Sequence, residues 1–110
     1  EAYPGLFARQ VLGNQSYKSD DKAKQTPERW VARKDLLNAL DTGQVNVLQG
    51  LRCVARPALQ ETMLQDASGD HVDAYLCLVQ AAWGLMQHQQ GHPCFGLPPC
   101  DPLEGWIVMA

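Results

Sequence analysis

The sequence predicts an α/β domain that is predominantly helical and carries one or two short strands. The main helix is expected at 70–90, because 11 of the 13 residues between Ala74 and Met86 are apolar. A strand is expected at 105–110, GWIVMA, where Trp, Ile and Val follow one another. The opening EAYPG has the form of the end of another strand. Because a strand cannot stand alone, we expect the rest of the sheet to precede Glu1.

Shorter helices are predicted before the main helix, at 4–12, 27–41 and 56–66. A proline lies at or next to the start of each, where its fixed φ favours the first helical turn. The polar segment 14–25 has no apolar periodicity and is expected to be a mobile surface loop. The segment 45–51 fits either a short strand or a loose connection.

The start of the main helix carries two aspartates. Asp70 is the expected N-cap, and Asp73 lies three residues on, where a first-turn carboxylate can reach back to the cap. The positive end of the helix dipole favours their ionised forms, so the pair either caps the helix or holds a cation. Further along, Gln80 and Gly84 interrupt the apolar run on one face, and Gly91 is expected to end the helix. We expect this helix to be buried on most sides.

Length and composition indicate one ordinary globular domain over 1–110. Of the 110 residues, 45% are apolar and 19% charged, and the longest apolar run falls short of the roughly 20 residues that span a bilayer. We therefore predict no membrane segment, and the first ten residues lack the pattern of a secretory signal. The four cysteines are few and unevenly placed, and Cys77 lies inside the apolar run. These features favour a reducing cytoplasm.

Charge is divided between the two halves of the chain. All nine Lys and Arg lie in 1–56, which has a net charge of +3, whereas 57–110 has a net charge of −6. The basic residues that could contact the phosphates of a nucleic acid are Lys18, Lys22, Lys24, Arg29 and Arg33. Acidic residues are interspersed among them, so an ordinary solvated surface is the alternative.

Another group of metal-ligand residue types follows the main helix. His88, His92, Cys94 and Cys100 are suitable donors for zinc, but their order misses the usual paired spacings of zinc sites. The sequence therefore argues against zinc. A disulfide between Cys94 and Cys100 is not expected in a reducing compartment either.

Stretches of the sequence, taken in order, resemble one family. They are EAYPG at 1–5, YKS at 17–19 before a basic helix, DHVDA at 70–74 opening an Ala- and Leu-rich helix, and LEGWIV at 103–108. Together they resemble the C-terminal half of the predicted RNase H-like nucleases known as domain of unknown function 429. The D-x-x-D-A pattern is also similar to the last acidic motif of RuvC-type Holliday-junction resolvases.

This resemblance implies the C-terminal part of an RNase H-like fold, in which a mixed sheet flanked by helices gathers acidic residues around Mg²⁺ or Mn²⁺. Asp70 and Asp73 match the final acidic pair, and Glu1 matches the Glu before Tyr-Pro, so all three are expected as metal ligands and catalytic residues. Two such ions can activate water and stabilise the leaving oxygen of a phosphodiester. The family's first half does not occur in these 110 residues. We therefore expect an inactive portion of a metal-dependent nuclease.

The alternative is a noncatalytic helical interaction module. Apolar surface left exposed where the predicted sheet should continue would favour self-association. The expected partner in this case is a second copy, bound through that apolar edge as a homodimer.

Overall fold

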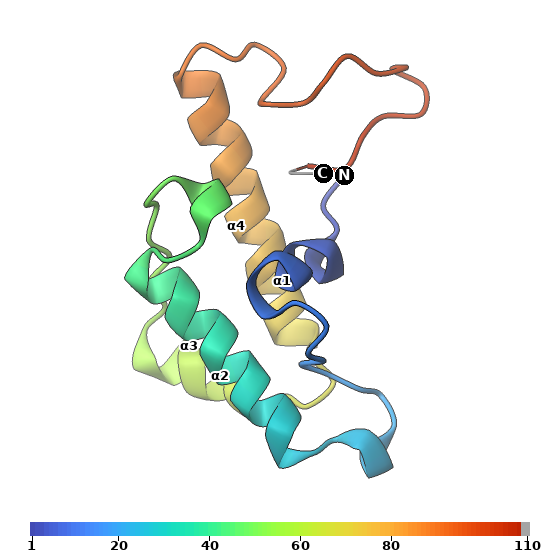
Figure 1. Cartoon of the computed structure of the whole chain (residues 1–110), viewed down its shortest axis with the longest axis vertical. Helices are drawn as coiled ribbons and strands as arrows, with labels where there is room; N and C mark the ends of the chain where they lie inside the picture. The colour runs from blue at the N-terminus through green and yellow to red at the C-terminus, as the bar shows by residue number, and fades with distance from the viewer. Residues whose placement is uncertain (109–110) are drawn as a thin grey trace.

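The computed structural model describes residues 1–108 and is built of helices and loops. The α-helices are α1 (Pro4–Leu12), α2 (Pro27–Thr42), α3 (Pro57–Gln65) and α4 (Asp70–Gln89), with single-turn 3₁₀-helices η1 (Lys22–Lys24) and η2 (Asn46–Leu48). Helix α1 packs against α2 and α4, and α3 packs against the same two helices. The C-terminal half of α4 extends past the other α-helices, with the η2 loop beside it (Figure 1). Several apolar side chains of α4, among them Leu78 and Leu85, remain exposed.

The prediction of an α/β domain with an RNase H-like sheet is wrong, because no strand occurs among residues 1–108. The two segments for which strands were expected do meet, at the ends of the chain (Figure 1). The Glu1 ammonium group donates to the Trp106 carbonyl at 2.9 Å, and the Val108 amide donates to the Glu1 carbonyl at 2.7 Å. Two hydrogen bonds do not make a sheet, and β-favouring residues without strand partners stay irregular. Residues 109 and 110 of the expected strand lie outside the described part.

The predicted helices are confirmed, with bounds within one residue of those expected. All of the three shorter helices have proline in the first turn, and Gly43 ends α2 in the left-handed conformation with φ of 73°. The undecided segment 45–51 is a connection that contains η2 rather than a strand. The loop 14–25 is not wholly a surface loop, because Tyr17 is only 6% exposed and belongs to the core.

The core lies between the four α-helices. Its largest fully buried apolar side chains come from α1, α2, η2, α3 and α4, and they are Phe7, Leu36, Leu40, Leu48, Met63 and Leu76. No helix in the described part of the chain combines the length and apolar character needed to cross a membrane.

Helix α4 is buried on one side only. Gln80 is 1% exposed and Gly84 is buried, so the face on which they interrupt the apolar run is a packed face. Leu78 and Leu85 are instead 63% and 52% exposed. The prediction that α4 is buried on most sides is therefore wrong. The physical reason is that tertiary neighbours decide which side is covered. Helices α1 and α3 pack against α4, the Gln80 amide donates to the Val108 carbonyl and the Trp83 ring to the Val47 carbonyl, both at 3.2 Å. Nearly every side chain in the middle of α4 is apolar, so the sequence pattern did not indicate that side.

Candidate functional site

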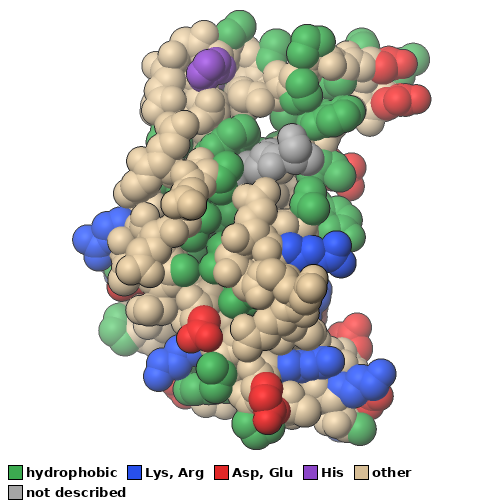
Figure 2. All heavy atoms as spheres, viewed as in Figure 1, with side chains coloured by type: hydrophobic (Ala, Val, Ile, Leu, Met, Phe, Trp, Pro, Cys, Tyr) green, Lys and Arg blue, Asp and Glu red, His purple; other side chains and the backbone are tan. Residues whose placement is uncertain are grey.

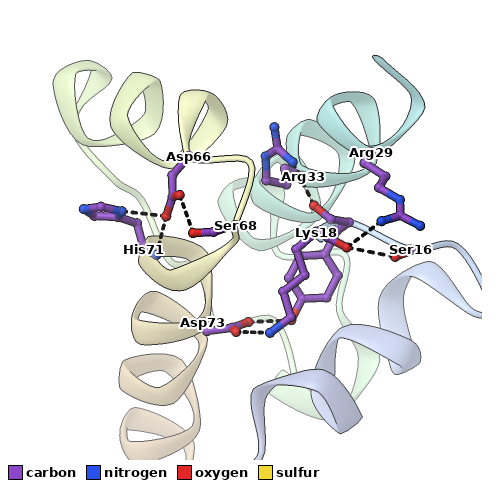
Figure 3. Close-up of polar contacts among 9 residues, drawn as sticks. Ser16, Lys18, Arg29, Arg33, Asp66, Ser68, His71 and Asp73 are labelled. Atoms are coloured by element: carbon purple, nitrogen blue, oxygen red, sulfur yellow. Dashed lines mark hydrogen bonds and ion pairs between the residues drawn. The ribbon is translucent and has the colours of Figure 1, made fainter. Parts of the chain in front are cut away.

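The first turn of α4 differs from the predicted cap. Gly69, with φ of 79°, occupies the N-cap position, and Asp70 is the first helical residue. The capping carboxylate is Asp66, which accepts from the His71 amide at 3.0 Å and from the Ser68 hydroxyl at 2.6 Å (Figure 3). The His71 ring nitrogen Nδ1 lies 2.7 Å from the same carboxylate. These hydrogen bonds, the one from Ser68 first, hold the pKa of Asp66 well below its ordinary value.

Sequence reasoning missed Asp66, although a local signal was present. An Asp followed two residues later by Ser, directly before Gly69, is typical of a turn in which the Asp side chain bonds the backbone that follows. Because Asp66 supplies the cap, neither Asp70 nor Asp73 is needed for it. Asp73 is bonded within the fold, whereas the Asp70 carboxylate has no hydrogen bond or ion pair within residues 1–108.

Asp73 faces the interior and is tied to the segment before α2. The Tyr17 hydroxyl donates to one carboxylate oxygen at 2.5 Å, and the Lys18 ammonium group pairs with the other (Figure 3). The Asp73 side chain is 19% exposed. Burial, together with the hydrogen bond to Asp73, raises the pKa of Tyr17 far above its ordinary value. Tyr17 therefore keeps its proton and acts as a hydrogen-bond donor.

Two arginines from α2 hold the other side of this segment. The Arg33 guanidinium donates to the Tyr17 carbonyl at 2.9 Å and, through two nitrogens, to the Leu64 carbonyl at 3.1 and 2.8 Å. Arg29 donates to the Lys18 carbonyl at 3.0 Å. Arg33 is only 3% exposed, and this burial lowers the pKa of its guanidinium. Arg33 thus joins three segments of the fold and is not available at the surface.

Gly69 completes the contact between the Tyr17–Lys18 segment and α4. A Cβ atom placed on Gly69 would lie 2.5 Å from the Lys18 Cβ, and the positive φ of Gly69 is a second requirement for glycine. The Ser19 amide donates to the Ala67 carbonyl at 3.2 Å in the same region. The start of α4 is therefore a tightly packed structural junction.

Several of the residues predicted to bind nucleic acid make structural contacts at this junction. Arg33 is buried, Lys18 is paired with Asp73, and Arg29 bonds a carbonyl. Lys22 and Lys24, in η1, are exposed. On the face drawn in Figure 2, Lys and Arg lie mixed with Asp and Glu over the lower part of the molecule, and the upper end has no basic side chain. The predicted cluster is therefore divided between structural residues and a mixed-charge surface.

The structure does not bring the three predicted metal ligands together. Glu1 lies with Glu104 and Trp106 around a shallow hollow of about 280 Å³ at the joined chain ends, whereas Asp70 and Asp73 share the first turn of α4. Among residues 1–108, no three His, Cys, Asp or Glu side chains are grouped so that they could hold a metal ion. The Mg²⁺ or Mn²⁺ site stays a prediction from the resemblance.

The residues considered for zinc lie beyond this junction, at the far end of α4. The His88 ring stacks on Phe95 with 4.4 Å between ring centroids. Cys94 and Cys100 are exposed free thiols in the loop that follows. The structure therefore uses His88 for an aromatic contact that holds this loop against α4.

A second candidate site is the outer side of α4, which we call the outer stripe: Ala74, Leu78, Ala81, Ala82 and Leu85. All five residues are exposed. Four of them repeat at intervals of 4, 3 and 4 residues, a spacing that places side chains in one row along a helix. The row lies opposite the buried side chains of the same helix, which include Leu76 and Trp83. An uninterrupted apolar row facing solvent is typical of a contact surface.

A scan against protein-family models and searches of curated proteins and of solved structures found no match to this chain.

Proposed function

We propose that this protein is a noncatalytic helical module that associates with a second copy of itself through the outer stripe of α4. The observation that carries the proposal is the exposure of Leu78 and Leu85, at 63% and 52%, in one continuous apolar row. Removing a leucine side chain from water is worth about 1.5–3 kcal/mol when it is fully buried. Association of two such rows would gain part of this free energy for each leucine.

The inner side of α4 supports this interpretation. Gln80 and Gln87 are 1% and 7% exposed and take up positions in the interior, while leucines stay outside. The fold of a single copy therefore gains nothing from the apolar character of the outer stripe. A partner that covers the stripe would account for it.

The size of the stripe sets the expected strength of association. From residue 74 to residue 85 an α-helix rises by about 17 Å. One helix side of this length is small beside the roughly 800 Å² that each partner buries in a standard interface. We therefore expect a weak, reversible dimer with a dissociation constant in the micromolar range or above.

Sedimentation velocity over protein concentrations from micromolar to several hundred micromolar tests the proposal. A reductant must be present, because Cys53, Cys77, Cys94 and Cys100 are all free thiols. The expected result is a monomer at low concentration and a growing dimer population at high concentration. Leu78→Lys and Leu85→Lys should each keep the chain monomeric.

Leu103→Lys is the matched control, because Leu103 is 95% exposed and lies outside α4. This variant should dimerise like the unsubstituted chain, and the helical circular dichroism of all three variants should be unchanged. A monomer at every concentration, or an equal loss of dimer in Leu103→Lys, would contradict the proposal.

A second candidate function is metal-dependent phosphodiester hydrolysis by an intact form of the protein, as the resemblance implies. One observation favours it: the Asp70 carboxylate has no hydrogen bond or ion pair within residues 1–108, so of the predicted metal pair it is the member open to a cation, whereas both oxygens of Asp73 are bonded to Tyr17 and Lys18. Titration with Mn²⁺, followed through the amide signals of residues 70–73, tests this function. Specific broadening that Asp70→Asn abolishes and Asp101→Asn leaves unchanged would support it. No broadening would contradict it.

The cytoplasmic location stays a prediction.

A further inference from the structure

We infer that two copies pair their α4 helices antiparallel, with the twofold axis at the level between residues 79 and 80. This inference rests on the proposed self-association and specifies its geometry. In this register Ala74 lies opposite Leu85 of the second copy, and Leu78 lies opposite Ala81 of the second copy. The row residues 74, 78, 81 and 85 thus form four facing pairs with the second copy, which we call layers. Each layer contains one leucine and one alanine.

Only the antiparallel direction gives this match between large and small side chains. In a parallel pair in register, each residue faces its own counterpart, so two layers would contain two leucines and two layers would contain two alanines. The leucine layers would hold the helices apart and leave gaps at the alanine layers. Alternation of large and small side chains lets the two helices approach evenly along the row.

Polar groups at the ends of the row favour the same direction. Asp70 and His88 are eighteen residues apart, about five helical turns, and so project from the same side of α4. Reversal of the second helix brings Asp70 beside His88 of the second copy, at both ends of the pair. Within residues 1–108 the Asp70 carboxylate has no hydrogen bond or ion pair, so it can accept one from that imidazole. The helix dipoles also oppose each other in this arrangement.

The other surroundings of these two residues are compatible with this contact. His88 is exposed, and Phe95 stacks on one face of its ring, so the nitrogens on the ring edge lie outside the stacking contact. Near Asp70, the neighbouring His71 is already bonded to Asp66. Asp70 is therefore the carboxylate of this turn that remains for a second molecule, since Asp73 is taken up by Tyr17 and Lys18.

Distance measurement between spin labels tests the direction of pairing. The background replaces Cys77 with Ala and the other three cysteines with Ser, and one label is attached to Gln89→Cys. In the antiparallel register, residue 89 of the two copies lies about 28 Å apart along the helix axis, from nineteen residues at 1.5 Å each. A label at Ala82→Cys should give a short separation, because its axial offset is only about 7 Å. A parallel pair would give short separations at both positions.

The outcomes separate this inference from the proposed function. If sedimentation finds no dimer, self-association itself fails. If sedimentation finds a dimer but the labels at residue 89 are close together, self-association holds and the antiparallel pairing is overturned. The labelled chains are measured at a concentration where sedimentation shows the dimer.

A residue swap tests the register within the antiparallel pair. Leu78→Ala should leave a gap and Ala81→Leu should produce a collision between leucines, so each single substitution should weaken dimerisation about tenfold. The double variant Leu78→Ala, Ala81→Leu restores one leucine and one alanine in each layer, and its dissociation constant should return to within about threefold of the original. If the two losses simply add in the double variant, these residues do not face each other. Both residues are exposed, so folding should be unaffected.

Discussion

The inner and outer sides of α4 place similar side chains in opposite environments. On the inner side Leu76 is fully buried next to a buried glutamine, Gln80, whereas Leu78 on the outer side is 63% exposed. The inner side is held by α1, α3 and hydrogen bonds to the Val47 and Val108 carbonyls, whereas all residues of the outer stripe are exposed. The comparison shows that the apolar character of a helix does not reveal which of its sides packs in the monomer. It also separates residues that maintain the fold from residues that are available for a partner.

The largest expected effect is on the inner side. Leu76→Ala should lower the free energy of unfolding by about 3 kcal/mol, because it removes a fully buried side chain and leaves a cavity. Leu78→Ala should change it by no more than about 0.5 kcal/mol. Urea denaturation followed by circular dichroism, at a concentration where the chain is monomeric, measures both values. Equal losses would mean that the two sides do not differ as the structure indicates.

The two predicted acidic residues repeat this comparison at the start of α4. Asp73→Ala should cost about 2 kcal/mol of stability, since it leaves the buried Tyr17 hydroxyl and the Lys18 ammonium group without their acceptor. Asp70→Ala should cost about 0.5 kcal/mol or less, the loss of a favourable charge at the helix N-terminus. Thermal unfolding of both variants under the same buffer conditions provides the measurement. A larger loss for Asp70→Ala would contradict the assignment of Asp73 as the structural member of the pair.

Local signals account for what could be predicted from the sequence. Prolines mark the starts of α1, α2 and α3, and glycines follow the ends of α1 and α2. Each signal lies within a few residues of the boundary that it predicts. The position of Asp70 and Asp73 in the first turn of α4 follows from the same kind of signal. These features depend on backbone preferences that act over one or two turns.

Contacts between distant parts of the chain account for what could not be predicted. Asp73 meets Tyr17, 56 residues away, and nothing near either residue indicates that contact. The side of α4 that faces the core depends on where α1 and α3 pack. Because α4 is apolar almost all round, its sequence pattern did not indicate which side that is. The strand prediction failed for a related reason: Trp106, Ile107 and Val108 favour a strand only when neighbouring strands are present.

The Asp66 cap predicts that the stability of the fold depends on pH. The residues of the outer stripe take no part in this cap. Asp66→Ala should lower stability by about 1 kcal/mol at neutral pH, the usual effect of losing an N-terminal cap. Because the pKa of Asp66 is lower in the folded state than in the unfolded chain, its contribution is complete above about pH 4 and is lost as the pH falls below that value. The stability difference between the variant and the original chain should therefore shrink between pH 4 and pH 2. A constant difference over that range would contradict the role given to the carboxylate.

The smallest expected effect belongs to the polar ends of the outer stripe. Asp70→Asn keeps the size of the side chain and removes its charge, so the contact with His88 of the second copy should weaken and the dimer dissociation constant should rise about twofold to threefold. Exposed charge contacts are worth less than 1 kcal/mol and are screened by salt, so the difference should fade at high ionic strength. Sedimentation equilibrium at low and high salt measures this, with Asp101→Asn as a control outside α4. If Asp70→Asn dimerises as well as the original chain at low salt, the leucine and alanine layers alone set the strength of the pair.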